Sequence, residues 1–237
     1  VRLVEKALPV TDKERAVSER KRELQMLDPR FITSTSYAIE QCEKATFRMA
    51  DYTKEALSTA MGLVLNFNEE GAAKVDQLER TVDDYEDQLN SYLSSISGKT
   101  FTAKDSHMFT LLMHCIGDFE RISDHALNVM QKAREMDEKG EHFSPRAQEE
   151  LQIFEAALND IMERTVRAFC EDNTQIAATV EPLEEVIDGL NMEIKRRHVK
   201  RLRKGKCTVE TGMALEDIIT DYERIADHCN NVAVHLS

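Results

Sequence analysis

The sequence predicts an all-α fold of two tandem, pseudo-symmetric three-helix bundles with six long helices. Three observations lead to this prediction. The 237 residues include only eight Gly and four Pro, which leaves few breakers for the turns of a β protein. Apolar residues recur at helical spacing through most of the chain. A motif in the first half of the chain returns in the second half, which indicates an internal repeat.

The first half of the chain is expected to hold a linker and three helices. Residues 1–32 are polar and charged, which favours a linker or a short helix. Gly98 ends the second of the three helices, and Thr102 with Asp105 forms the pattern of a capping box that opens the third. The expected helices cover residues 35–65, 75–93 and 102–136, in a first bundle at residues 33–140.

The second half repeats this plan. Ser144 is a favourable N-cap residue, and Pro145 follows at the first helical position, where a proline is tolerated. Gly205 and Thr208 mark the break before the last helix. The expected helices cover residues 145–170, 175–203 and 209–237, in a second bundle at residues 141–237.

The composition excludes several classes of protein. The formal net charge is -13 and the pI is near 5.1, which argues against a nucleic-acid partner because a phosphate backbone is bound by a positive surface. No apolar run approaches the roughly 20 residues of a membrane-spanning helix, so a soluble chain is expected. The five cysteines lack any Cys-x-x-Cys spacing, which favours a reducing compartment and apolar positions on helices.

The internal repeat is clearest in one octapeptide. Asp118-Phe-Glu-Arg-Ile-Ser-Asp-His125 returns as Asp221-Tyr-Glu-Arg-Ile-Ala-Asp-His228, with six of eight positions identical. A weaker sequence similarity between the halves occurs on the helix that precedes the octapeptide in each half. The repeats contain four pairs of the form Glu-x-x-x-Asp, which are Glu79/Asp83, Glu120/Asp124, Glu184/Asp188 and Glu223/Asp227.

Each pair places two carboxylates on one helix face, where they repel each other by a few tenths of a kcal/mol. Oxygen-rich clusters suit magnesium, manganese or iron ions, so we expect metal binding at the pairs of the octapeptides, Glu120/Asp124 and Glu223/Asp227. For Glu79/Asp83, which is flanked by Asp84, Glu86 and Asp87, a solvated acidic face is the favoured interpretation. Two other interpretations stay open: a solvated acidic face, and a salt-bridge network through Arg121 and Arg224. His125 and His228 could be ligands, outer donors or interhelical hydrogen-bonding groups, and we do not count them as ligands.

With these motifs, the chain resembles the PhoU family of phosphate-signalling regulators. The resemblance covers residues 33–237 and rests on the order of helices, the two-fold repeat and the Glu-Arg-Ile-x-Asp signature. It implies a fold of two three-helix bundles and metal clusters at the eight carboxylates, with iron, manganese, magnesium or zinc as the ion. It also implies a regulatory, non-enzymatic module in phosphate transport or homeostasis.

The opening segment is similar to the linker of bacterial sodium/phosphate cotransporter-related proteins, in which membrane helices precede a PhoU-like domain. This resemblance implies a domain on the cytoplasmic side of the inner membrane, in a longer, membrane-anchored protein. The partner would be the transporter portion of the same chain, or else a phosphate transporter or sensor. A homodimer is a further expectation that stays open.

A basic run at Lys195–Lys206 has no counterpart in the first half of the chain. Cations at the end of a helix complement its dipole. Eight of them exceed that need, so contact with anionic lipid headgroups or a phosphate-bearing ligand is an equal alternative.

Two other functions compete with the regulatory module. A helical scaffold would bind partner proteins and use its carboxylates only for salt bridges. A di-iron carboxylate enzyme is the weaker competitor, because such enzymes use Glu-x-x-His pairs, and this spacing accompanies none of the motifs.

Overall fold

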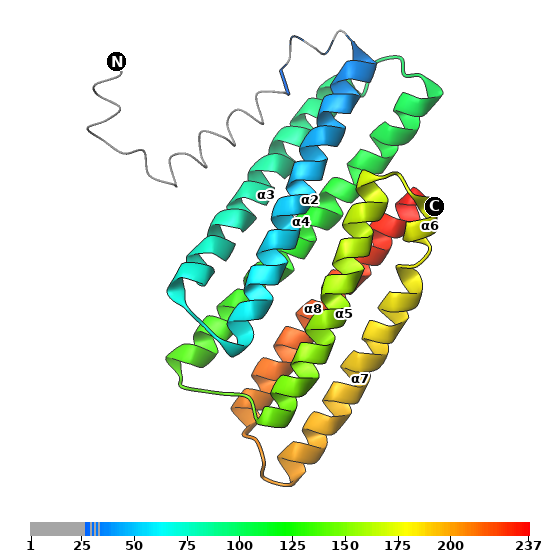
Figure 1. The fold of residues 1–237 in the computed structure, drawn as a ribbon. Helices are drawn as coiled ribbons and strands as arrows, with labels where there is room; N and C mark the ends of the chain where they lie inside the picture. The colour runs from blue at the N-terminus through cyan, green and yellow to red at the C-terminus, as the bar shows by residue number, and fades with distance from the viewer. Residues whose placement is uncertain (1–26, 29, 31, 33) are drawn as a thin grey trace, which may run out of the picture.

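A computed structural model shows how the helices are arranged (Figure 1). It describes residues 27, 28, 30, 32 and 34–237, so most of the expected linker at residues 1–32 lies outside the described residues. The described part of the chain is all-α and contains no β-strand, as the sequence predicts. Its helices are α2 (Thr35–Leu65), α3 (Glu69–Ile96), α4 (Ala103–Glu138), α5 (Pro145–Cys170), α6 (Thr174–Ala177), α7 (Glu181–Arg203) and α8 (Val209–Leu236).

Capping side chains fix where several of these helices begin. The capping box before α4 is confirmed, since the Asp105 amide donates to Thr102 Oγ1 (3.1 Å) and the Thr102 amide donates to Asp105 Oδ2 (3.4 Å). The N-cap of α5 is also confirmed, because Ser144 Oγ accepts from the Ala147 amide at 3.4 Å. Pro145 occupies the first turn of α5, where its missing N–H costs no helical hydrogen bond.

Glycines end α4 and α7. Gly140 and Gly205 have φ values of 66° and 61°, in the left-handed region that favours glycine. The Glu141 amide then donates to the Met136 carbonyl at 2.9 Å, which satisfies one of the last carbonyl groups of α4. The same device thus closes a helix in each half of the chain.

The second helix is longer than the sequence predicts. It begins at Glu69 rather than near residue 75. Asn68 Oδ1 accepts from the Gly71 amide at 2.8 Å, and the acidic side chains of Glu69 and Glu70 lie in the first turn, near the positive end of the helix dipole. This turn carries few apolar residues, so a search for apolar periodicity misses it.

The fifth expected helix is divided in two. Residues 175–203 were expected to form one helix, but the short α6 ends at Ala177 and α7 begins only at Glu181. Pro182 is the physical reason, because a proline clashes with the carbonyl four residues before it and is tolerated only in the first turn.

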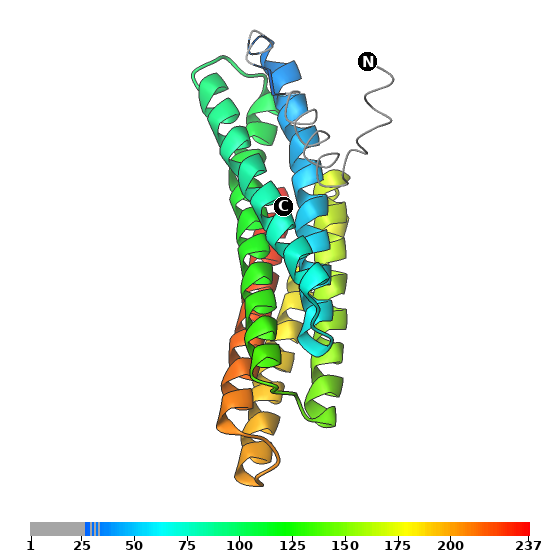
Figure 2. The ribbon, with the colours of Figure 1, turned by 90° about the vertical axis from the view of Figure 1, so that its left-hand side faces the viewer.

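The two halves of the chain meet along α4 and α8. α4 packs against α2, α3 and α8, while α8 packs against α4, α5 and α7. In both views the long helices run roughly parallel or antiparallel to one another (Figure 2). Apolar residues of the octapeptides lie in this core: Phe119 contacts Phe169 (ring centroids 5.4 Å apart) and Tyr222 contacts Phe154 (5.4 Å). The division into bundles at residues 33–140 and 141–237 stays a prediction.

Two expectations from composition can be compared with the structure. Cys42, Cys115 and Cys229 are buried on helices as expected, and none of the five cysteines forms a disulfide. The expectation was wrong for Cys170, which is exposed, and for Cys207, which is half-buried and precedes α8. None of the described helices is long and apolar enough to span a bilayer.

Candidate metal centre

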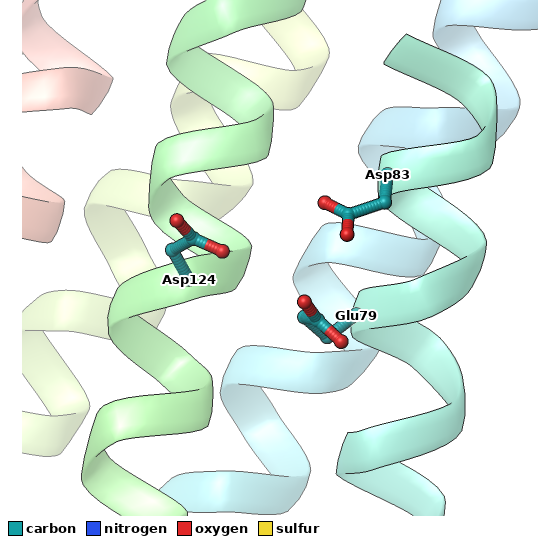
Figure 3. Close-up of side chains that lie close together, drawn as sticks. All are labelled: Glu79, Asp83 and Asp124. Atoms are coloured by element: carbon teal, nitrogen blue, oxygen red, sulfur yellow. The ribbon is translucent and has the colours of Figure 1, made fainter. Parts of the chain in front are cut away.

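Three carboxylates from α3 and α4 converge between these helices (Figure 3). Glu79 and Asp83 lie one turn apart on α3, and Asp124 faces them from α4. Each residue offers one oxygen, and the three oxygens all lie within 4.8 Å of one another. The structure thus joins residues that belong to two different Glu-x-x-x-Asp pairs of the sequence.

Buried neighbours hold these carboxylates at the edge of the core. On α3, Leu78 and Val82 are buried, and on α4, Phe119 and Ile122 are buried. Burial of each such side chain contributes on the order of 1.5–3 kcal/mol, which fixes the rotation of both helices. Helical periodicity then leaves the acidic positions beside the buried stripe, where Glu79 is half-buried and Asp83 and Asp124 are exposed.

Two more glutamates share the electrostatic field of this site. Burial, followed by the charges of Asp83 and Asp124, raises the pKa of Glu79 to about 7. Burial, followed by the charges of Asp124 and Glu86, raises the pKa of Glu120 to about 7. Burial and then neighbouring acids also raise the pKa of Glu86. We call these five residues the first acidic cluster.

The first acidic cluster fits a hard or borderline cation. Burial and the charge of Asp124 raise the pKa of Asp83, so crowding disfavours the charged forms of several members at once. Among the described residues, no lysine or arginine forms an ion pair with any of the five. The charge of Arg80 acts on Glu79 without forming an ion pair. A set of oxygen ligands with so little counter-charge suits magnesium, manganese or iron better than copper.

The corresponding acids of the second half lie on α7 and α8. Burial, followed by the charges of Asp188 and Asp227, raises the pKa of Glu184. Glu223 is joined to α7 by Asn191, whose Nδ2 donates a hydrogen bond to Glu223 Oε2. We call the four acids together with Asn191 the second acidic cluster. Within the described part of the chain, no three acids of this cluster place ligand oxygens within 4.8 Å of one another.

One substitution and one ion pair distinguish the two clusters. Asn191 stands where the first half has Glu86, since each follows the first glutamate of its cluster by seven residues. Arg224 Nη1 lies 3.4 Å from Asp227 Oδ2, so the salt-bridge interpretation holds for this arginine. Arg121, its counterpart, forms no ion pair with any described residue. The second cluster therefore has one carboxylate fewer and one ion pair more.

Sequence reasoning overlooked Glu86 and Asn191 as site residues. A signal was present, because seven residues are two helical turns and return a side chain to the same face. Glu86 was hidden among neighbouring acids at Asp84 and Asp87, and an asparagine gives no acidic signal at all.

The two histidines of the octapeptides join α4 to α8. His125 Nδ1 lies 2.8 Å from Asp221 Oδ1, and His228 Nδ1 lies 2.8 Å from Asp118 Oδ1. The two imidazole rings stack, with centroids 5.8 Å apart and planes 27° apart. Of the three roles left open by the sequence, the structure thus shows the interhelical hydrogen bond. We call these two contacts the reciprocal crossing.

The reciprocal crossing explains the outer positions of the octapeptide. Asp118 and Asp221 open the two copies, and sequence reasoning assigned them no role. Asn231 Nδ2 adds a second hydrogen bond to Asp118 Oδ1 at 3.2 Å. Each copy therefore carries cluster residues at its third and seventh positions and crossing residues at its first and eighth.

A comparison with protein families places this geometry in a known context. The model of the PhoU domain matches residues 46–133 and 155–235 of the chain. The chain is 25% identical over 186 residues to a protein of Thermotoga maritima named phosphate-specific transport system accessory protein PhoU homolog 1. That match covers 78% of this chain and 79% of the relative.

Solved structures have the same fold. The crystal structure of PhoU from Pseudomonas aeruginosa superposes with a TM-score of 0.78 at 19% identity, covering 83% of this chain and 94% of that one. The phosphate transport system regulatory protein PhoU from Streptococcus pneumoniae gives a TM-score of 0.76 at 16% identity, covering 86% and 95%. Since the family model matches more than half of its residues, this chain belongs to the PhoU family.

Proposed function

We propose that this chain is a metal-holding, non-enzymatic regulatory module of a phosphate transport system. The convergence of Glu79, Asp83 and Asp124 within 4.8 Å carries the proposal, because carboxylates this close repel one another and are stabilised by a cation. The name of the Thermotoga relative, an accessory protein of phosphate-specific transport, supports the regulatory part. The metal would hold α3 against α4, and iron, manganese, magnesium and zinc are the ions to test.

The competing functions have less support. A di-iron carboxylate enzyme would need a histidine three residues after a glutamate, and no histidine of this chain stands in that position. A metal-free scaffold would have to keep the first acidic cluster without an ion pair to lysine or arginine, and repulsion among its carboxylates would then oppose folding. The scaffold is therefore the alternative that the metal measurement must exclude.

The measurement is elemental mass spectrometry on the purified chain after incubation with iron, manganese, magnesium and zinc. We expect about one or more equivalents of metal per chain and a loss of metal in Asp124→Asn. Asp227→Asn tests the second cluster in the same way. Glu149→Gln is the control, because it removes one negative charge from an exposed position outside both clusters.

Circular dichroism must show that each variant is folded. If the parent chain stays metal-free with all four ions, or if Glu149→Gln loses as much metal as Asp124→Asn, the metal site is excluded. The scaffold would then be the better interpretation.

We further propose that the chain is the domain of a sodium/phosphate cotransporter-related protein, on the cytoplasmic side of the inner membrane. The resemblance of residues 1–32 to the linker of such proteins supports this proposal. Reading the coding sequence upstream of Val1 tests it. Several long apolar segments in frame would support the proposal, whereas a start codon directly before Val1 would contradict it.

A further inference from the structure

A hollow of about 700 Å³ lies between the beginning of α5 and the C-terminal part of α7. Seven lysine and arginine side chains line it, against two glutamates, so its cations exceed its acids by five. This contrasts with the chain as a whole, whose formal charge is -13. Six of the eight cations of the basic run that sequence reasoning left unexplained therefore line one concave site.

The two glutamates hold guanidinium groups in place. Arg201 Nη1 lies 2.7 Å from Glu150 Oε2, and both side chains are largely buried, with 12% and 8% of their surfaces exposed. On the same wall, Arg197 Nε lies 2.6 Å from Glu193 Oε1. Side chains that are ordered before a ligand arrives lose less conformational entropy on binding. These arginines are therefore preorganised hydrogen-bond donors.

Arg201 has one donor that the protein does not use. Its Nη2 atom is buried and has no hydrogen-bond partner among the described residues. A buried donor without an acceptor costs roughly 1–3 kcal/mol, more when the group is charged. Arg201 lines the hollow, so an anion bound there is the candidate for the missing acceptor.

Arg196 also pairs with Glu193, but four further cations of the hollow have no such partner. Arg146, Lys200, Lys204 and Lys206 form no ion pair with any described residue. The dipole at the C-terminus of α7 amounts to only about half a negative charge. Ser144 and Pro145 also line the hollow, so the positive end of the α5 dipole lies there as well.

We propose that this hollow binds a phosphate-bearing anion, either free in solution or as the headgroup of a lipid. Guanidinium groups match phosphate oxygens in a bidentate manner, and lysine ammonium groups add point charges. The proposal stands apart from the proposed metal site, because no residue that lines the hollow belongs to either acidic cluster.

Two binding experiments on the whole, metal-free chain distinguish the sources of the phosphate group. Titration calorimetry with inorganic phosphate and pyrophosphate tests free anions. Co-sedimentation with vesicles of phosphatidylcholine, with or without phosphatidylglycerol, tests lipid headgroups. The test variant is Lys200→Gln/Lys204→Gln, which removes two unpaired cations of the hollow.

The matched control is Lys195→Gln/Arg203→Gln. It removes the same two charges from the same basic run, but neither residue lines the hollow. We expect the affinity to fall by about tenfold or more in the test variant, because two charge-assisted contacts are lost. In the control we expect the affinity to change by less than about twofold, because the two removed charges act on the ligand only at long range.

The results of the two binding experiments distinguish a free phosphate ligand from a lipid headgroup. Calorimetric binding that the test variant loses supports a free phosphate ligand. Binding only to vesicles with phosphatidylglycerol, again lost in the test variant, supports a lipid headgroup. Absence of binding in both experiments, or an equal loss in test and control variants, overturns the site.

Discussion

The two halves of this chain use the same octapeptide with different results. In the first half, three acids converge and none of the cluster's five forms an ion pair with lysine or arginine among the described residues, whereas the second cluster has Asn191 in place of an acid and Arg224 beside Asp227. The reciprocal crossing is also unequal: the side chains of Asp118 and His228 are each 11% exposed, against 18% for Asp221 and 23% for its partner. A repeat can thus keep its spacing while its copies diverge in charge and burial.

Removal of the crossing aspartates gives the largest expected difference between the halves. Asp118→Ala should lower the free energy of unfolding by about 3 kcal/mol, because Asp118 accepts from His228 and Asn231 in a buried position. Asp221→Ala should cost about 1 kcal/mol, since its contact with His125 is more exposed. Urea unfolding monitored by circular dichroism measures both. Equal losses would show that the two contacts are equivalent.

An exchange of the residues that differ between the clusters tests the charge difference directly. Glu86→Asn should weaken manganese binding at the first cluster by about tenfold, or 1.4 kcal/mol, because it removes one carboxylate. Asn191→Glu should strengthen binding at the second cluster by a similar factor. Calorimetric titration with manganese measures both effects on folded protein. If both variants bind more weakly, the position serves packing rather than metal affinity.

A pH-dependent difference comes from Glu155, which is half-buried beside Tyr222 in the second half. Tyr222 donates a hydrogen bond to Glu155 Oε1 at 3.0 Å, whereas Phe119, its counterpart, needs no acceptor. Burial raises the pKa of Glu155 from 4.5 to about 7. The folded state therefore holds this proton more tightly than the unfolded state, so its contribution to stability is present below pH 4.5 and is lost as the pH rises through 7.

Glu155→Gln should remove this part of the pH dependence and keep an acceptor for Tyr222. The variant should gain on the order of 1 kcal/mol over the parent at pH 8, after allowance for partial solvent screening, and little at pH 4. Tyr222→Phe is the control and should keep the pH dependence, because burial is its main cause. Thermal unfolding at both pH values measures the difference. A gain that is equal at both pH values would contradict the assignment to Glu155.

The smallest expected effect concerns Arg224. Its ion pair with Asp227 is exposed, at 62% and 39% of the two side chains, so Arg224→Gln should change the free energy of unfolding by less than about 0.5 kcal/mol. Arg121→Gln is the matched variant in the first half and should change it equally little. Urea unfolding at low and high salt measures both. A salt-sensitive loss well above this value would show that Arg224 belongs to a larger network.

Local chemistry made most of the fold predictable. The capping box at Thr102 and Asp105, the N-cap at Ser144 and the glycine at 140 depend only on nearby residues, and the structure confirms them. The break before α7 was missed because it depends on where Pro182 falls relative to a helix start, which apolar spacing does not show.

The candidate site was predictable only in part, because its geometry is tertiary. Spacing of four residues shows that Glu79 and Asp83 share a face, but the approach of Asp124 requires the packing of α3 on α4. The contact of His228 with Asp118 joins residues 110 positions apart. No local pattern reports such a contact.

The reciprocal crossing has the symmetry of a two-fold dimer contained in one chain. In an isologous interface, residue i of one copy contacts residue j of the other, and the reverse contact also occurs. Asp118 with His228, and His125 with Asp221, stand in this relation. Each half thus carries both members of the contact. Halves separated at residues 139–144 and produced apart are therefore expected to associate when mixed, which size-exclusion chromatography would detect, and one half alone would have a self-complementary surface for pairing with its own copy.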